Sequence, residues 1–292
     1  MSKAWRIGAA ALMGLAVSLP LPCVRAFGGA LLAGPDLAAA TGSAAPAAIP
    51  DRGAVSRFGT PRAALVAGLE DFRAGASDSA IAALKYAAAG GETLARWKLA
   101  TIYAAGEGVP HDDLKAYEYF SQIVENYDED GPNWRDRSLV ANAFVALGAY
   151  SLSGIEATKV TPDPARALAL FKYAAANFGD STAQYRLARM YLEGAGGDKD
   201  SRQGVRWLYL AADKGHVQAQ ALLGRMLFSG EEGLRPDHAR ALMWMTLARE
   251  ATTDSAKDAW IVDLYDKSLA AASESERQTA LAYLEDHLKR RN

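Results

Sequence analysis

The chain contains few side chains of the kinds that perform chemistry, and their spacing does not assemble a reactive site. Its histidines are far apart, and no two have a metal-ligand spacing; they are His111, His216, His238 and His287. We interpret them as surface histidines near turns and helix starts. The adjacent carboxylates Glu231 and Glu232 could serve as acid and base, but nothing in the sequence places them in a pocket. We therefore predict that the chain is not an enzyme and has neither a cofactor nor a metal site.

The glycine-rich segments lack the context of a phosphate-binding loop. Gly106 and Gly108, and the cluster that begins at Gly194, follow segments with helical apolar spacing, whereas phosphate loops follow a strand and open a helix. No Gly-x-Ser-x-Gly motif occurs, and the single cysteine, Cys23, lies near the N-terminus. These glycines are therefore predicted to form turns between helices.

A short motif recurs along the chain, with copies that begin at Trp97, Tyr185 and Ala221. The last two copies stay in register at a spacing of 36 residues, as from Gly179 to Gly215. A fixed period of this length indicates stacked supersecondary units, none of which can bury its apolar face alone. The positions that define the repeat are Gly106, Gly108, Ala183, Leu187, Gly194, Gly215, Ala219, Leu223 and Gly230.

Local signals place two helices in each unit. Leu187, Met190 and Tyr191 share one helix face, and Gly194 follows where a helix end needs a left-handed residue. Small residues inside the second helix are expected to let its partner approach closely; they are Ala95, Ala183 and Ala219. Helix starts are predicted at capping residues, namely Asp112 or Asp113, Asp163 before Pro164, Asp200 or Ser201, and Asp237.

A further copy of the motif, Ala143 to Gly154, is stretched by additional residues on both sides. The extra length lies in Glu125 to Arg137 and in Ile155 to Pro162. Insertions in a repeat protein emerge as loops on one side, which is often the binding side. The acidic run Asp128 to Asp130 is either a solvated loop or a docking element.

The first 26 residues are typical of a signal peptide. Lys3 and Arg6 precede an apolar run that ends near Leu21, and small residues follow up to Ala26. The run is too short for a comfortable membrane span of about 20 residues, so we expect no span in the mature chain. Cys23 is a less favoured site of lipid attachment. Residues 27–59 are rich in Ala, Gly and Pro and are predicted to be a flexible leader.

The charge of the chain argues against binding of nucleic acid. Removal of residues 1–26 takes three of the 32 basic residues and no acidic residue, which leaves 29 against 34. The resulting net charge of about −5 lacks the basic footprint of a nucleic-acid-binding protein.

The repeat motif resembles the Sel1-like repeat, a relative of the tetratricopeptide repeat. The pattern is Ala-x-x-aromatic-apolar-x-x-Ala, then Gly, then Ala-Gln-x-x-Leu-Gly/Ala-x-Met/Ile-Tyr/Leu-x-x-Gly, and it covers roughly residues 60–252. The resemblance implies an all-α, right-handed solenoid of about five helix-turn-helix units. Residues 253–292 are then expected to form C-terminal capping helices.

The segment Arg96 to Ala100, with Tyr103, Gly106 to Val109 and Asp113 to Tyr117, precedes the stretched unit. With the signal peptide, this arrangement is similar to the ExoR family of periplasmic negative regulators of exopolysaccharide production. The resemblance implies a periplasmic protein that binds the periplasmic domain of a membrane sensor histidine kinase and inhibits its signalling. One alternative is a periplasmic scaffold for a polysaccharide exporter, usually lipid-anchored. Another, a repeat-built hydrolase, needs a nucleophile or disulfides that this chain lacks.

A variable stripe is the candidate partner-binding surface. In the helices that we take to open each unit, a small residue recurs at Ala80, Ala116, Ala167, Gly204 and Ala241. Positions two and five residues later vary and share a helix face. On the premise that opening helices line the concave wall, we expect these positions to contact the partner. The candidates are Lys85, Glu118, Lys172, Arg206 and Tyr209, with Arg206 and Tyr209 favoured because arginine and tyrosine are enriched in hot spots.

Overall fold

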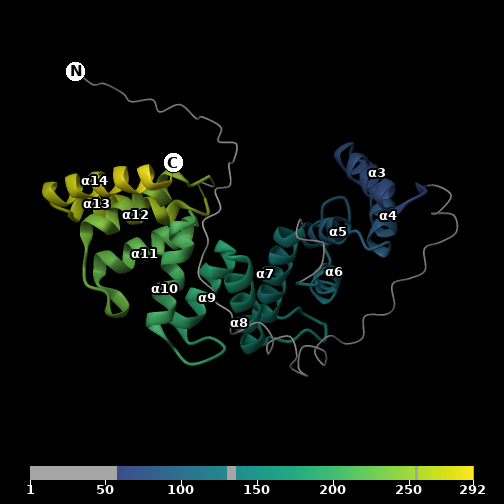
Figure 1. Ribbon diagram of the computed structural model, residues 1–292, viewed down its shortest axis with the longest axis horizontal. Helices are drawn as coiled ribbons and strands as arrows, with labels where there is room; N and C mark the ends of the chain where they lie inside the picture. Colours follow the sequence, from purple (N-terminus) through teal and green to yellow (C-terminus); the bar gives the residue numbers. More distant parts are fainter. Residues whose placement is uncertain (1–57, 130–135, 254–255, 292) are drawn as a thin grey trace, which may run out of the picture. The chain divides into compact units, whose positions relative to one another are not determined.

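The computed structural model describes residues 58–129, 136–253 and 256–291, and these residues form helices and connecting turns without a strand. The signal peptide, Cys23 and nearly all of the leader lie outside the described residues. Twelve α-helices follow one another along the described chain (Figure 1). Their bounds are α3 Pro61–Arg73, α4 Ser77–Ala89, α5 Thr93–Ala105, α6 Asp113–Glu125, α7 Arg137–Ser153, α8 Pro164–Tyr173, α9 Ser181–Glu193, α10 Ser201–Asp213, α11 Val217–Ser229, α12 His238–Glu250, α13 Ala259–Ala271 and α14 Glu274–Arg291.

Aspartate side chains fix the starts of the helices by accepting free backbone amides. Asp112 accepts from the backbone of Lys115 at 2.9 Å, so it is the cap of α6 rather than Asp113. Asp200 caps α10 in the same way, and Ser201 is the first residue of the helix. Asp163 and Asp237 cap α8 and α12 as predicted.

Glycines end the helices that the repeat motif predicted. The C-caps of α5, α9 and α11 all adopt a left-handed backbone, which glycine tolerates because it has no Cβ atom. Their φ angles are 69° at Gly106, 72° at Gly194 and 73° at Gly230. A short π-helix, Ala174–Phe178, continues α8 and ends at Gly179, also left-handed.

The helices pack in consecutive pairs along the chain, most extensively as α3 with α4, α5 with α6, α7 with α8, α9 with α10, and α11 with α12. This grouping differs from the premise that α4, α6, α8, α10 and α12 open the units, because each of them is the second member of its closest pair. The second helix of each pair also contacts the first helix of the next pair, so the periodicity alone does not mark where a unit begins.

The alanines and leucines of the repeat motif lie in the core. Leu187 and Leu223 are fully buried, as are Ala95, Ala183 and Ala219. The alanines leave room for the neighbouring helix, as predicted. In the stretched unit, glycine has the same effect: a Cβ atom on Gly148 would stand 2.6 Å from the ring of Phe171. Close approach of α7 and α8 therefore depends on small residues as much as on large ones.

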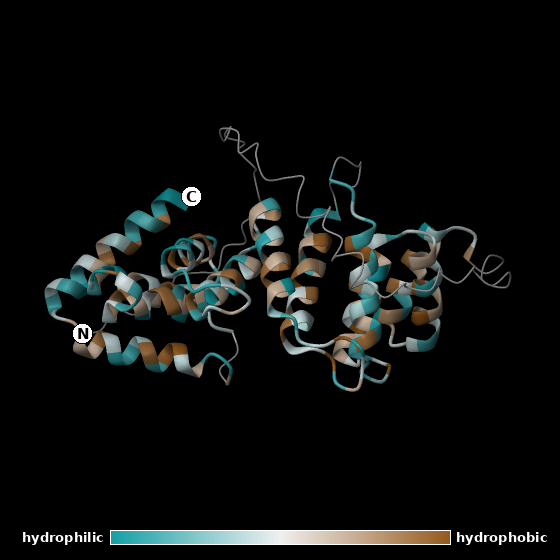
Figure 2. Cartoon of the chain, turned by 90° about the horizontal axis from the view of Figure 1, so that it is seen from below, coloured by the Kyte–Doolittle hydropathy of each residue, from teal (hydrophilic) through white to brown (hydrophobic). Residues whose placement is uncertain are grey.

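Two further helices follow the repeats at the C-terminal end. α13 packs against α11 and α12, whereas α14 packs against α12. Both hydrophobic and hydrophilic stretches run along most helices in Figure 2, and α14 becomes hydrophilic toward its C-terminus. On α14 the buried residues are Ala280 and His287. The helix thus covers α12 with a narrow face and leaves a charged face outside.

Candidate partner-binding surface

The histidines serve structural roles in the described part of the chain. His111 pairs with Asp113, and His216 caps α11 by accepting from the backbone of Ala219. His287 is buried, so its interpretation as a surface residue was wrong: the docking of α14 on α12 places it beneath Trp244. Among the described residues, no group of three or more His, Cys, Asp or Glu side chains could hold a metal ion.

The predicted stripe lies along alternate helices. Lys85 on α4, Glu118 on α6, Lys172 on α8 and Arg206 on α10 are exposed, and Tyr209 on α10 is half-buried. Ser121 and Met243, which occupy equivalent positions, are buried and interrupt the stripe. Only Arg206 and Tyr209 come from a single helix, three residues apart, and could contact one partner side chain together.

Tyr209 packs on the next unit. Its ring meets Trp244 of α12 edge to face, with centroids 6.5 Å apart and an interplanar angle of 77°. Burial raises the pKa of the Tyr209 hydroxyl, which stays protonated and can donate a hydrogen bond at neutral pH. The same ring borders a surface cavity of about 560 Å³, with Arg235, His238 and Glu276 on its other sides.

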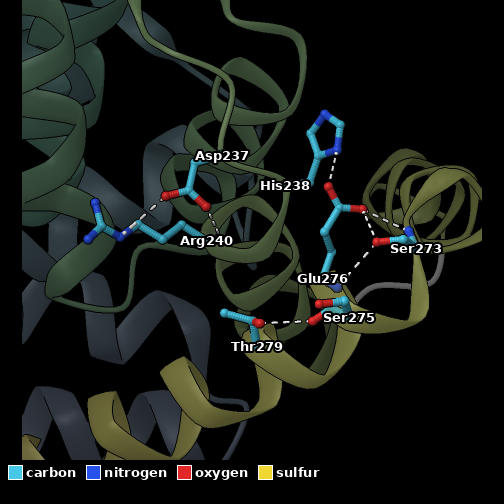
Figure 3. A network of polar contacts seen from close by, with 7 residues as sticks. All are labelled: Asp237, His238, Arg240, Ser273, Ser275, Glu276 and Thr279. Carbon is cyan, nitrogen blue, oxygen red and sulfur yellow. Dashed lines mark hydrogen bonds and ion pairs between the residues drawn. The ribbon is translucent and has the colours of Figure 1, made fainter.

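A network of polar contacts holds the far wall of this cavity, where α12 and α14 begin (Figure 3). His238 Nδ1 lies 2.9 Å from Glu276 Oε1, which joins the two helices. Glu276 Oε2 accepts from both the backbone N–H and the hydroxyl of Ser273, at 2.7 and 2.8 Å. These hydrogen bonds from Ser273, with His238, lower the pKa of Glu276. The carboxylate is therefore ionised at neutral pH, and its hydrogen bonds fix the start of α14 against α12.

The charged groups on the cavity wall are paired with one another, apart from Arg235 at the rim. Asp237 caps α12 and lies 3.6 Å from the Arg240 guanidinium, so its charge is neutralised within the cavity wall. Arg235 contributes an exposed guanidinium at the rim. Tyr209 was predicted from the sequence, whereas the residues of the opposite wall of the cavity were not. The spacing of Ser273 and Glu276, a capping box, was the signal that could have located the start of α14.

The repeats match the Sel1 repeat family at residues 93–128, 141–177, 181–216 and 217–252. These boundaries agree with the pairs α5–α6, α7–α8, α9–α10 and α11–α12, so the units open with the helices that we had placed second. The stretched copy is the second matched repeat. The pair α3–α4 lies before the first match.

Two relatives that match over most of their length show the family. The chain is 35% identical over 249 residues to the exopolysaccharide production negative regulator of Rhizobium meliloti (strain 1021), covering 85% of this chain and 90% of the relative. The chain belongs to this family of Sel1-repeat regulators. A second member, the exopolysaccharide production negative regulator of Rhizobium leguminosarum bv. viciae, is 34% identical over 232 residues, or 79% of this chain and 84% of that one.

Solved structures agree with the fold of the family. A protective antigen from uropathogenic Escherichia coli strains, which displays an SLR fold, superposes with a TM-score of 0.65 at 22% identity, covering 80% of this chain and 46% of that one. A Sel1 repeat protein from Oxalobacter formigenes gives a TM-score of 0.53 at 20% identity, covering 68% and 74%. Within the described residues of this family member, none of the helices has the length and apolarity that crossing a membrane requires.

Proposed function

We propose that the chain is a periplasmic regulator that represses exopolysaccharide production by binding the periplasmic domain of a membrane sensor histidine kinase. The observation that carries the proposal is the match to two exopolysaccharide production negative regulators, which extends over 90% and 84% of their lengths. An alignment of 249 residues extends beyond the four matched repeats, which lie within residues 93–252. Inhibition then requires only that the bound chain favour the inactive state of the kinase.

The physical character of the chain supports a role in binding. Its repeats expose charged side chains along several helices, and the polar groups around Tyr209 are paired with one another rather than arranged around a substrate. In this proposal, Arg206 and Tyr209 form the contact surface on α10. Arg206 supplies an exposed charge and Tyr209 a ring held in place by Trp244.

Location is part of the proposal. The signal-peptide features of residues 1–26 support export, and cleavage after Ala26 would release a chain without cysteine. Mass measurement of the mature N-terminus tests this step. An acylated Cys23 would contradict the proposed release and favour the scaffold of a polysaccharide exporter.

The test of the function combines deletion with capture. Deletion of the gene should raise exopolysaccharide output, and expression of the exported chain should restore repression. The tagged chain, crosslinked in intact cells, should retain a sensor histidine kinase that an equally tagged export control does not. Unchanged polysaccharide after deletion would contradict the regulatory role. Retention of exporter components instead of a kinase would replace the proposed partner with the scaffold alternative.

A further inference from the structure

A second concave site is formed by helices that do not carry the residues of the predicted stripe. It is a groove of about 640 Å³ to which α9, α11 and α13 contribute, together with the short 3-10 turn Glu231–Gly233. α9 and α11 open the last two matched repeats. The groove therefore combines equivalent helices of successive units with the first helix beyond the repeats.

The centre of this groove is apolar. Leu192, Leu222 and Leu264 are partly buried around Met226, which is only 1% exposed. Trp260 stands at one side with 44% of its surface exposed, an unusual degree for the largest apolar side chain. An exposed tryptophan beside apolar side chains gains free energy when another apolar group covers it.

The charges at the rim are already paired with one another. Arg189 lies 2.6 Å from Glu193 on α9, and Lys267 lies 2.7 Å from Asp263 on α13. The remaining two acidic residues are also neutralised, Glu231 by Arg225 at 3.3 Å and Glu232 by Lys199 at 2.9 Å. An occupant with a net charge would have to break one of these pairs or face a like charge. The groove is thus electrostatically complementary to an uncharged segment.

The composition of the lining fits a protein partner. Aromatic residues, Met and Arg are enriched in protein interfaces. Such interfaces have an apolar centre and a polar rim. The groove has this anatomy, with Tyr185 and Trp260 as its aromatic residues and paired charges around them. We propose that the groove binds an uncharged segment of the protein partner that inserts one bulky apolar side chain beside Trp260. This inference rests on the proposed function, since it describes how the same partner is held.

Labelled peptides test the groove without the kinase. The probe is a neutral Gly/Ser peptide with a single central Phe, measured by fluorescence anisotropy against the full chain. Matched peptides carry Ala at the centre, or Phe flanked by two Lys or by two Glu. Saturable binding is expected for the neutral Phe peptide, and both charged versions should bind more weakly. A Phe peptide that binds no better than its Ala counterpart would overturn the proposal.

Variants locate the binding. Trp260→Ala should lower the affinity for the Phe peptide by more than about tenfold, which is the effect expected of a hot-spot residue. Leu281→Ala removes another exposed apolar side chain, 61% exposed on α14, and should change affinity less than about twofold. Both variants should retain wild-type helicity and melting. Equal peptide affinity in Trp260→Ala and wild type would contradict the assignment. A dimer of the wild-type chain that Trp260→Ala abolishes would also contradict it, because a second copy of the chain would then occupy the groove.

Capture of the kinase separates this inference from the proposed function. If wild type captures the kinase and Trp260→Ala does so equally well, the groove is not the contact and the function stands. If wild type captures no kinase but binds the Phe peptide through Trp260, the proposed partner fails and the groove stands as a peptide site. Loss of kinase capture in Trp260→Ala alone, with Leu281→Ala unaffected, supports both.

Discussion

His287 lies edge-on against Trp244, with ring centroids 5.2 Å apart and planes at 71°. Burial, and then the nearby Arg291, lower the pKa of His287 from its ordinary value of 6.5. The unfolded chain therefore binds more protons than the folded chain below about pH 6.5, so the free energy of unfolding falls as the pH falls through this value. His287→Gln should flatten the decline in stability between about pH 7.5 and 5.5, as measured by urea unfolding.

His111 provides a control of opposite sign. Its hydrogen bond and ion pair with Asp113 raise its pKa, so its contribution to stability is present below about pH 6.5 and is lost at higher pH. His111→Gln should leave the acid decline as steep as in wild type, or steeper. A decline in His287→Gln as steep as in wild type would contradict the role assigned to His287.

Leu187 and Leu223 test the packing of successive repeats. Each is fully buried, and replacement by Ala should lower the free energy of unfolding by about 2 to 5 kcal/mol. Leu210→Ala, at a position 47% exposed on α10, should change it by less than about 0.5 kcal/mol. Chemical unfolding of the three variants measures the difference. Equal stability of the buried and exposed variants would show that the core is assigned wrongly.

The start of α14 depends on Ser273. Its hydroxyl and backbone N–H donate to Glu276, which in turn holds His238. Ser273→Ala removes one cap contact and should cost about 0.5 to 2 kcal/mol. Hydrogen exchange should accelerate first in the opening turn of α14, while the exchange of α9 amides stays unchanged. Uniform acceleration across both helices would argue against a local cap.

Local features of this fold were predictable from sequence, whereas features set by packing between helices were not. Asp163 and Gly194 act through their own backbone neighbours, so their roles as caps could be predicted. The starting point of the unit could not be predicted, because the helices from α4 to α12 pack against both of their neighbours along the chain and the period is the same from either starting point. His287 is buried only because α14 docks on α12, a contact between distant segments.

The candidate surface shows the same division. The exposure of Arg206 followed from its place on a helix, but the contact between Tyr209 and Trp244 required the arrangement of α10 against α12. The stripe was selected on the premise that its helices open the units. That premise was wrong. The stripe therefore stays a prediction, and mutation of its residues is the test.

Charge reversal at Arg206 tests the stripe directly. Arg206→Glu changes an exposed side chain and should shift stability by less than about 0.5 kcal/mol. If this surface contacts the kinase, capture should weaken because the substitution replaces an attractive positive charge with a negative charge that repels the same partner group. Arg73→Glu, an equal charge change on the exposed end of α3, is the matched control. Full capture by a folded Arg206→Glu variant would remove this residue from the contact surface and leave the groove as the remaining candidate.

We propose that the chain binds a sensor histidine kinase and inhibits it. The most direct measurement is autophosphorylation of the captured kinase in vesicles whose periplasmic side is accessible, with increasing amounts of the purified chain. We expect phosphorylation to fall to a plateau as the chain saturates the kinase, and we expect the heat-unfolded chain to have no effect. Phosphorylation that stays constant while the chain demonstrably binds, or a chain that does not bind at all, would contradict the proposal.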